Sequence, residues 1–177
     1  MSASNNPAGA TSAAAAVILR LPRASDRDRV REIVEATGVF RPDETPIALE
    51  VFDTAVRAPG TDYWAVGAYV STRMAGFAVF GPVPCTLATW DLYWIAVDPA
   101  AQGMGIGRRL MAHCEEAIVA EGGRLIVVET SSRHDYAATR AFYQRLGYEA
   151  GAAIPEYYAP GDALIVFTKY LRPSASE

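Results

Sequence analysis

The stretch DPAAQGMGIGRRLM, from Asp98 to Met111, constrains the fold more than any other part of the chain. It packs three glycines into five residues, directly after the nearly all-apolar stretch Trp90–Val97. Such an apolar stretch is typical of a central strand that is buried on both faces. After the glycines, apolar residues recur at helical spacing, namely Leu110, Met111, Cys114, Ala117 and Ile118. The segment therefore predicts a buried strand, a short turn and a helix.

A glycine inside a helix costs about 1 kcal/mol relative to alanine, so three together favour a close approach of the backbone to a ligand. The first N–H groups of a helix lack helical partners, and with the helix dipole they suit a phosphate or pyrophosphate. A Walker A loop is excluded because no lysine followed by serine or threonine is present. A Rossmann fingerprint is excluded because its last glycine position falls on Arg108 or Leu110. The alternative to an anion-binding turn is a flexible loop that leads into a helix.

The remaining patterns predict a mixed α/β domain over residues 17–171, with tails at 1–16 and 172–177. The expected order is one strand, two helices, three strands, a helix, a strand, a helix and two strands. Strands are expected at Val17–Leu21, Tyr63–Val70, Met74–Phe80, Trp90–Val97, Leu125–Val128, Tyr148–Ile154 and Ala163–Tyr170. The last two strands should flank a loop from Pro155 to Asp162, and residues 136–146 should form a helix.

Composition excludes several classes of function. The chain has 177 residues, a hydrophobic fraction of 51% and a net charge of −4, which disfavours nucleic-acid binding. No apolar run approaches the length of a membrane span, and the start lacks the basic region of a signal peptide. The two cysteines and two histidines lack metal-ligand spacing. We therefore expect a cytoplasmic protein that binds no metal, nucleic acid or membrane, and an oligomer such as a dimer is compatible with the sequence.

Three segments in this order resemble the GNAT superfamily of acyl-CoA-dependent N-acetyltransferases. QGMGIG matches its Q/R-x-x-G-x-G/A motif, LYWIAVDP resembles its fourth strand, and AFYQRLGYE resembles its F/L-Y-x-x-x-G-F/Y segment. The resemblance implies a mixed sheet of about seven strands with helices on both faces, splayed between strands 4 and 5. It also implies acetyl-CoA as co-substrate. The residues implied in cofactor binding are Ile95, Ala96 and Val97 along the pantetheine, and Gln102, Gly103, Met104, Gly105, Ile106, Gly107 and Arg108 at the pyrophosphate.

Tyr143 is the proposed general acid, because the family commonly has a tyrosine at this place and a phenol holds its proton at neutral pH. On a helix from Tyr136, we expect Thr139, Phe142 and Leu146 to face the core and Tyr143 to point at a ligand. Many members carry an asparagine seven residues earlier, where this chain has Tyr136. Its hydroxyl or Arg140 could take over that contact with the cofactor.

Two carboxylates are candidates for the general base. Asp91 lies where the resemblance places the glutamate of histone-type members, and Glu129 resembles the base of members that acetylate protein N-termini. A carboxylate in a buried strand is paired or has a raised pKa, which suits a base toward an ammonium group. Asp91 is preferred, although either residue could instead cap a strand or pair with an arginine.

The sequence says less about the acceptor site than about the cofactor site or the catalytic residues. Glu156, Tyr157 and Tyr158 lie in the last hairpin and could hold a cationic amine, and residues 38–44 could border the same site. The expected activity is transfer of an acetyl group from acetyl-CoA to a primary amine of a small molecule or protein N-terminus by direct attack. The alternatives are a non-catalytic acyl-CoA-binding module, and a transferase that uses a longer acyl group or a hydroxyl acceptor.

Overall fold

The computed structural model describes residues 16–171, so the predicted tails lie outside the described residues except for Ala16. The elements follow the predicted order of strands and helices. Their bounds are β1 Val17–Arg20, α1 Arg27–Thr37, α2 Glu44–Arg57, β2 Trp64–Val70, β3 Arg73–Pro82, β4 Thr89–Val97, α3 Ile106–Ala120, β5 Leu125–Ser131, α4 Ala137–Arg145, β6 Glu149–Ala159 and β7 Asp162–Tyr170.

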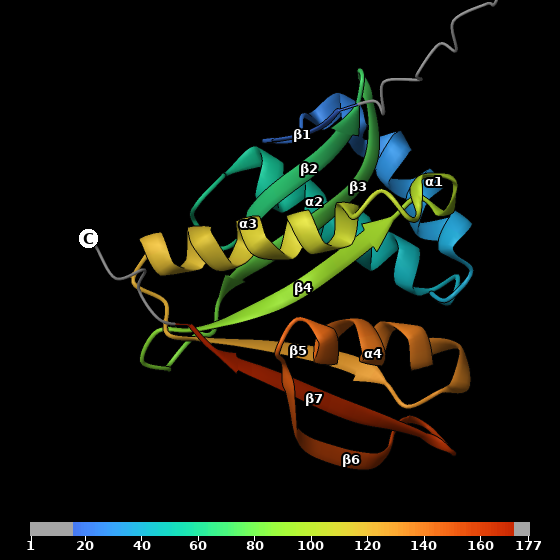
Figure 1. The fold of residues 1–177 in the computed structure, drawn as a ribbon, viewed down its shortest axis with the longest axis vertical. Coiled ribbons are helices and arrows are strands. Elements are labelled where there is room, and N and C mark those ends of the chain that lie inside the picture. Colours follow the sequence, from blue (N-terminus) through green and yellow to red (C-terminus); the bar gives the residue numbers. More distant parts are fainter. Residues whose placement is uncertain (1–15, 172–177) are drawn as a thin grey trace, which may run out of the picture.

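The strands form a single sheet in the order β1-β2-β3-β4-β5-β7-β6. Only the pairing of β4 with β5 is parallel, and the other neighbours are antiparallel. Helices α3 and α4 cover one face and α1 and α2 lie behind the sheet (Figure 1). Two cores follow from this layering, because the apolar faces of α1 and α2 pack against one side of the sheet and that of α3 against the other. The predicted mixed α/β architecture is confirmed.

The sheet forks between β4 and β5. The two strands pair only from Thr89 to Asp91 and from Leu125 to Val127, after which both continue without pairing to each other. Figure 1 shows the two strands diverging from this short pairing. The splay that the sequence predicts between strands 4 and 5 is therefore present, and it leaves backbone groups of β4 free on the β5 side.

A β-bulge lies at the fork. Opposite β3, Val79 pairs with Trp94 and Phe80 with Leu92, so Tyr93 is an extra residue in β4. The extra residue reverses the alternation of side chains beyond it. As a result, Trp94 packs against the core under α1 and α2, whereas Leu92 belongs to the core under α3.

The last hairpin differs from its prediction. Residues 155–159, expected in a loop, belong to β6, and only Pro160 and Gly161 separate it from β7. The register of the pair shifts between Ile154 and Ala159, where Pro155 offers no N–H to the ladder and Glu156 has a φ of 54°. The predicted loop is thus an irregular stretch of strand.

Between residues 16 and 171, no helix is long and apolar enough to cross a membrane. Within the same residues, no three histidine, cysteine, aspartate or glutamate side chains are grouped so that they could hold a metal ion.

Candidate functional site

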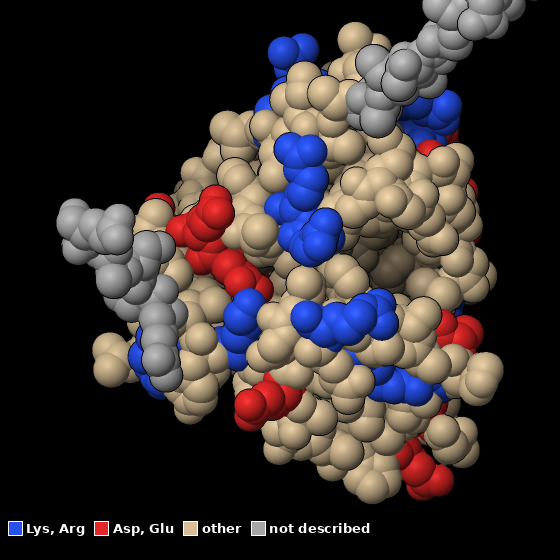
Figure 2. Space-filling view, viewed as in Figure 1, with Lys and Arg blue, Asp and Glu red and all other residues tan. Residues whose placement is uncertain are grey.

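A cavity of about 1220 Å³ occupies the fork. Its walls come from β4 and β5 beyond their pairing, the start of α3, one side of α4, and the segment between α1 and α2. The cavity therefore reaches both faces of the sheet. Figure 2 shows its opening as a hollow on the α3 and α4 face.

The glycine segment forms one end of the cavity. Gly103 and Gly105 have φ values of 84° and 70°, and Gly105 is the N-cap of α3. Only glycine adopts this left-handed conformation without strain, so the turn and the exposed N–H groups of the first helical turn depend on it. Of the predicted cofactor residues here, Gln102, Gly103, Gly105, Ile106, Gly107 and Arg108 line the cavity, and so do Ile95, Ala96 and Val97. Met104 is not among the lining residues and is 38% exposed.

Gly107 has a different role from the other two glycines. A Cβ at this position would lie 3.3 Å from the ring of Phe142, so the glycine lets the first turn of α3 approach α4 closely. The costly run of glycines thus has two causes, which are left-handed backbone at two positions and close packing at the third.

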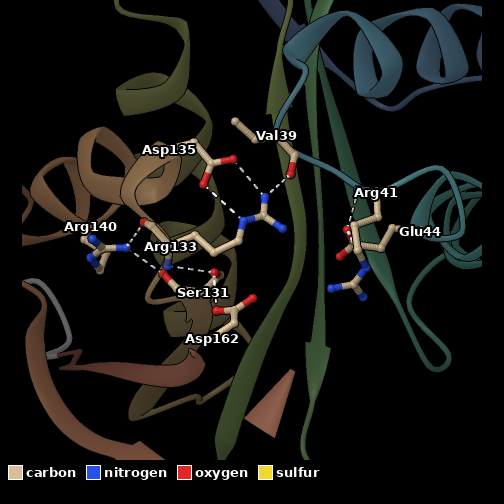
Figure 3. A network of polar contacts seen from close by, with 8 residues as sticks. All are labelled: Val39, Arg41, Glu44, Ser131, Arg133, Asp135, Arg140 and Asp162. Atoms are coloured by element: carbon tan, nitrogen blue, oxygen red, sulfur yellow. Dashed lines mark hydrogen bonds and ion pairs between the residues drawn. The ribbon is translucent and has the colours of Figure 1, made fainter. Parts of the chain in front are cut away.

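Basic side chains border the opening on this face, as Figure 2 shows. Arg108 from α3 and Arg145 from α4 both line the cavity. Arg145 was missed by the sequence analysis, although its spacing of seven residues from Ala138 places both on one face of α4. Arg140 instead donates from Nη1 to the carbonyl oxygens of Ser131 (2.7 Å) and Arg133 (2.9 Å), and it does not line the cavity (Figure 3).

Tyr143 lines the cavity from α4 but is only 3% exposed. Its ring packs 5.7 Å from Tyr148 and 5.9 Å from Phe167, between ring centroids. The expectation that Tyr143 lies outside the core is wrong, because it is the buried residue of α4. Phe142 and Leu146 pack against the core as expected, and with Thr139 they are half-buried and also line the cavity.

The Tyr143 hydroxyl makes no hydrogen bond with any residue between 16 and 171. Burial raises the pKa of Tyr143 above its ordinary value, so the phenol is protonated at neutral pH. Its hydroxyl proton is therefore not committed to any group of the described protein.

Asp91 and Glu129 both line the cavity, on the face away from α3 and α4. Their chain neighbours Trp90, Leu92 and Val128 pack in the core under α3, and side chains alternate along a strand. Burial, followed by the charge of Glu129, raises the pKa of Asp91 to about 6. The two candidate bases are thus neighbours in a single site, with Asp91 half-buried and Glu129 exposed.

The segment between α1 and α2 forms the opposite wall, where Val39, Phe40, Arg41 and Glu44 line the cavity. The ring of Phe40 lies 5.0 Å from that of Trp94. Residues 38–44 were expected to border the acceptor, and four of them thus lie at the cavity wall.

Arg133, which the sequence analysis missed, joins the two sides of the fork. Its Nη2 donates to the carbonyl of Val39 (2.6 Å) and pairs with Asp135 (2.9 Å), as Figure 3 shows. Asp162 of β7 accepts a hydrogen bond from the hydroxyl of Ser131 (2.5 Å), which fixes the end of β5. Arg133 carried no signal in the sequence because its partner is a backbone carbonyl 94 residues away.

The two adjacent tyrosines of the last hairpin differ in their position relative to the cavity. Tyr158 lines the cavity, and Tyr136 from the start of α4 does so as well. Burial, followed by the charge of Glu129 in the same cavity, raises the pKa of Tyr158 to about 12. Glu156 and Tyr157 do not line the cavity and are exposed.

Two buried polar atoms that belong to cavity-lining residues have no partner within residues 16–171, the Trp94 Nε1 and the Thr130 Oγ1. A buried polar atom without a hydrogen bond costs about 1–3 kcal/mol. Such atoms are uncommon in packed cores and concentrate here in the walls of the fork.

Comparisons with known proteins agree with this geometry. Residues 27–148 match the sequence profile described as "Acetyltransferase (GNAT) family". The N-alpha-acetyltransferase RimI of Mycobacterium tuberculosis is 32% identical over 135 residues, which are 76% of this chain and 79% of RimI. The Blasticidin-S acetyltransferase of Streptomyces morookaense is 44% identical over 68 residues, which are 38% of this chain and only 46% of that relative.

Solved structures share the fold over nearly the whole chain. A GNAT-family protein from Desulfovibrio desulfuricans has a TM-score of 0.85 at 40% identity, covering 89% of this chain and 100% of the other. An aminoglycoside 6'-N-acetyltransferase complexed with coenzyme A has a TM-score of 0.72 at 18% identity, covering 90% and 99%, which concerns the fold alone. With its forked sheet, glycine turn and cavity, and with a matching profile over more than half its length, the chain belongs to the acetyltransferase (GNAT) family.

Proposed function

We propose that the protein transfers an acetyl group from acetyl-CoA to a primary amine of a small molecule or a protein N-terminus. The observation that carries the proposal is the cavity through the fork, which has a glycine turn and arginines at one end and uncompensated carboxylates at the other. An anionic cofactor suits the first end, and an ammonium group suits the second.

The residues present fit coenzyme A. Gly105 and the first turn of α3 offer free N–H groups to a pyrophosphate, and Arg108 and Arg145 add positive charge beside them. The strand β4 beyond Tyr93 offers unpaired backbone to an extended arm. Solved relatives of the same fold are complexed with coenzyme A or acetyl-CoA, which supports the same co-substrate here.

Each protein group has one task in the reaction. Acetyl-CoA supplies the acetyl thioester. Asp91 accepts a proton from the ammonium group, so that the free amine can attack the thioester carbonyl and form the new C–N bond. Backbone N–H of β4 at Ile95 stabilises the negative oxygen of the tetrahedral state. As the C–S bond breaks, Tyr143 donates its hydroxyl proton to the departing sulfur, and the nitrogen of the new amide gives up its extra proton, which returns to the Tyr143 oxygen through water in the cavity.

The acceptor could be either of two kinds, because the relatives named above include a protein N-alpha-acetyltransferase and an acetyltransferase named for Blasticidin S. The test is release of free coenzyme A from acetyl-CoA, followed with a thiol reagent, in the presence of a panel of amines and N-terminal peptides. Amine-dependent release with formation of the acetylated amine is expected. Cofactor binding without release for any member of the panel, and with longer acyl-CoA donors and hydroxyl acceptors as well, would instead indicate a non-catalytic acyl-CoA-binding module.

A further inference from the structure

The acceptor end of the cavity holds more negative charge than one base requires. We propose that the acceptor carries two positive charges, with the reacting ammonium group at Asp91 and a second cationic group held by Glu129. This inference rests on the proposed function and adds the class of acceptor, a dicationic amine. It gives Glu129 a role in selecting the substrate rather than in taking its proton.

The first observation is which carboxylates of the cavity are already engaged. The cavity is lined by five carboxylates, namely Glu44, Asp91, Glu129, Asp135 and Asp162. Glu44 accepts the backbone N–H of Arg41 (2.6 Å), Asp135 pairs with Arg133 (2.9 Å), and Asp162 accepts the Ser131 hydroxyl (2.5 Å). In the part of the chain that the structure describes, Asp91 and Glu129 have neither a hydrogen bond nor an ion pair. Two negative groups are therefore available to a ligand.

The second observation is that each of these carboxylates has an aromatic neighbour of its own. The Tyr93 ring lies over Gly81, the residue paired with Asp91 in β3, since a Cβ at Gly81 would be 3.3 Å from it; the ring is 4.9 Å from that of Tyr63. Tyr158 of β6 lines the same cavity as Glu129. A carboxylate together with an aromatic face is a favourable environment for an organic cation. The fork thus contains two such environments, one on each of its strands.

The spacing of the two environments follows from the strand register. Val127 lies opposite Asp91, and Glu129 is two residues further along β5 on the same face. A strand spacing of about 4.8 Å and a rise of about 3.3 Å per residue place the two Cα atoms at least about 8 Å apart. This separation leaves room for two cationic groups joined by a short linear chain or a single ring, with one group at each carboxylate.

The different exposure of the two groups separates their roles. Burial disfavours the charged form of Asp91 and raises its pKa to about 6, which poises it for proton transfer. Glu129 is exposed at the outer end of the fork. An exposed carboxylate without a partner in the described protein is suited to hold the second cationic group of the acceptor.

The test compares linear α,ω-diamines with monoamines of the same chain length, using protein loaded with coenzyme A and isothermal calorimetry. The diamines are expected to bind about tenfold more tightly, which corresponds to about 1.4 kcal/mol.

The variants separate the roles of the two carboxylates. Glu129→Gln should remove this difference and raise the KM of the diamine, while kcat should still fall at low pH as in the unaltered protein (the acid limb of the pH profile). Asp91→Asn should lower kcat and remove that limb. Glu116→Gln, at an exposed position on α3 outside the cavity, is the matched control and should change nothing.

Two results would overturn the inference. Equal affinities of matched monoamines and diamines would show that no second cation is recognised. Loss of kcat and of the acid limb in Glu129→Gln would make Glu129 the base. Absence of acetyl transfer to any amine, with the diamine still bound more tightly, would refute the proposed function and leave the dicationic site standing, so the two failures are distinguishable.

Discussion

Tyr143 and Tyr148 are buried tyrosines of one core cluster, and they differ in what their hydroxyl groups contact. The Tyr148 hydroxyl donates to Glu115 (2.9 Å), which also pairs with Lys169 (2.7 Å). The Tyr143 hydroxyl has no partner among residues 16–171. Replacing either tyrosine by phenylalanine removes only the hydroxyl oxygen. The two variants therefore separate the structural hydroxyl of Tyr148 from the proposed catalytic hydroxyl of Tyr143.

Tyr143→Phe should lower kcat by about 10²-fold, as expected for loss of a general acid, with little change in the affinity for coenzyme A. The melting temperature should stay unchanged because no hydrogen bond within the described protein is lost. Steady-state kinetics and differential scanning fluorimetry measure the two effects. The control Tyr148→Phe should show the reverse, with normal kcat and a loss of about 1–2 kcal/mol of unfolding free energy. Unaltered turnover in Tyr143→Phe would remove Tyr143 from the mechanism.

The burial that suits Asp91 to accept a proton also lowers the stability of the folded protein at neutral pH. Its folded-state pKa of about 6 lies above the ordinary value of 3.8, so the folded state binds a proton that the unfolded state releases between these pH values. Stability from this group is therefore fully present below about pH 4 and is lost as the pH rises through about 6.

Asp91→Asn should therefore raise the unfolding free energy at pH 7 by about 1–2 kcal/mol after allowance for solvent screening, and leave it unchanged near pH 4. The same variant should lose the rise of kcat around pH 6. Urea unfolding at both pH values and a pH–rate profile measure these effects. Asp62→Asn, at an exposed position, should alter neither. Equal destabilisation of the Asp91 variant at both pH values would contradict the desolvation argument.

At the scale of elements, the start of α3 is the proposed binding site for the pyrophosphate of coenzyme A. Gly105 sits at the N-cap with a φ of 70°, and Gly122 beyond the other end of the helix has a φ of 79°. A Cβ at Gly105 would meet only the end of the Arg108 side chain at 3.6 Å, and one at Gly122 would meet nothing within 4 Å. The cost of alanine at either position is thus conformational, about 1 kcal/mol.

Gly105→Ala and Gly122→Ala should therefore lose similar unfolding free energy, about 1 kcal/mol each. Only Gly105→Ala should weaken binding of coenzyme A, by about tenfold, because relief of the strain moves the N–H groups that face the cavity. Calorimetric titration with coenzyme A measures the difference. Equal affinities in the two variants would mean that the glycine turn does not hold the cofactor.

The sequence predicted the elements better than their irregularities. The glycine turn, the buried strand before it and the order of strands carry strong local signals, and all are present. The bulge at Tyr93 and the shift after Pro155 depend on pairing with distant strands, so periodicity along one strand could not locate them. Tyr143 was placed outside the core because the helical face was assigned without the Tyr148 and Phe167 rings that bury it.

At the scale of the whole molecule, the fork divides the sheet into two halves. Strands β1–β4 and strands β5–β7 share only three pairs of residues across the β4–β5 boundary. Beyond Asp91, Arg133 links the halves again by donating to the Val39 carbonyl (Figure 3). Because Val39 and Phe40 line the side of the cavity that we propose for the acceptor, this hydrogen bond also fixes the width of the fork there.

Arg133→Ala should therefore raise the KM of the amine acceptor severalfold and leave the affinity for coenzyme A unchanged, since the cofactor end of the cavity lies on the other face. The variant loses the hydrogen bond to Val39 and the solvent-screened ion pair with Asp135, and because the arginine is 30% exposed the total cost should be about 1 kcal/mol of unfolding free energy. Arg124→Ala is the matched control, because Arg124 also donates to a backbone carbonyl, that of Leu87 at 2.8 Å, far from the fork. It should lower stability by a similar amount without changing either KM. A rise in the KM for both substrates in Arg133→Ala would show that the two ends of the cavity are coupled through the fork and do not act independently.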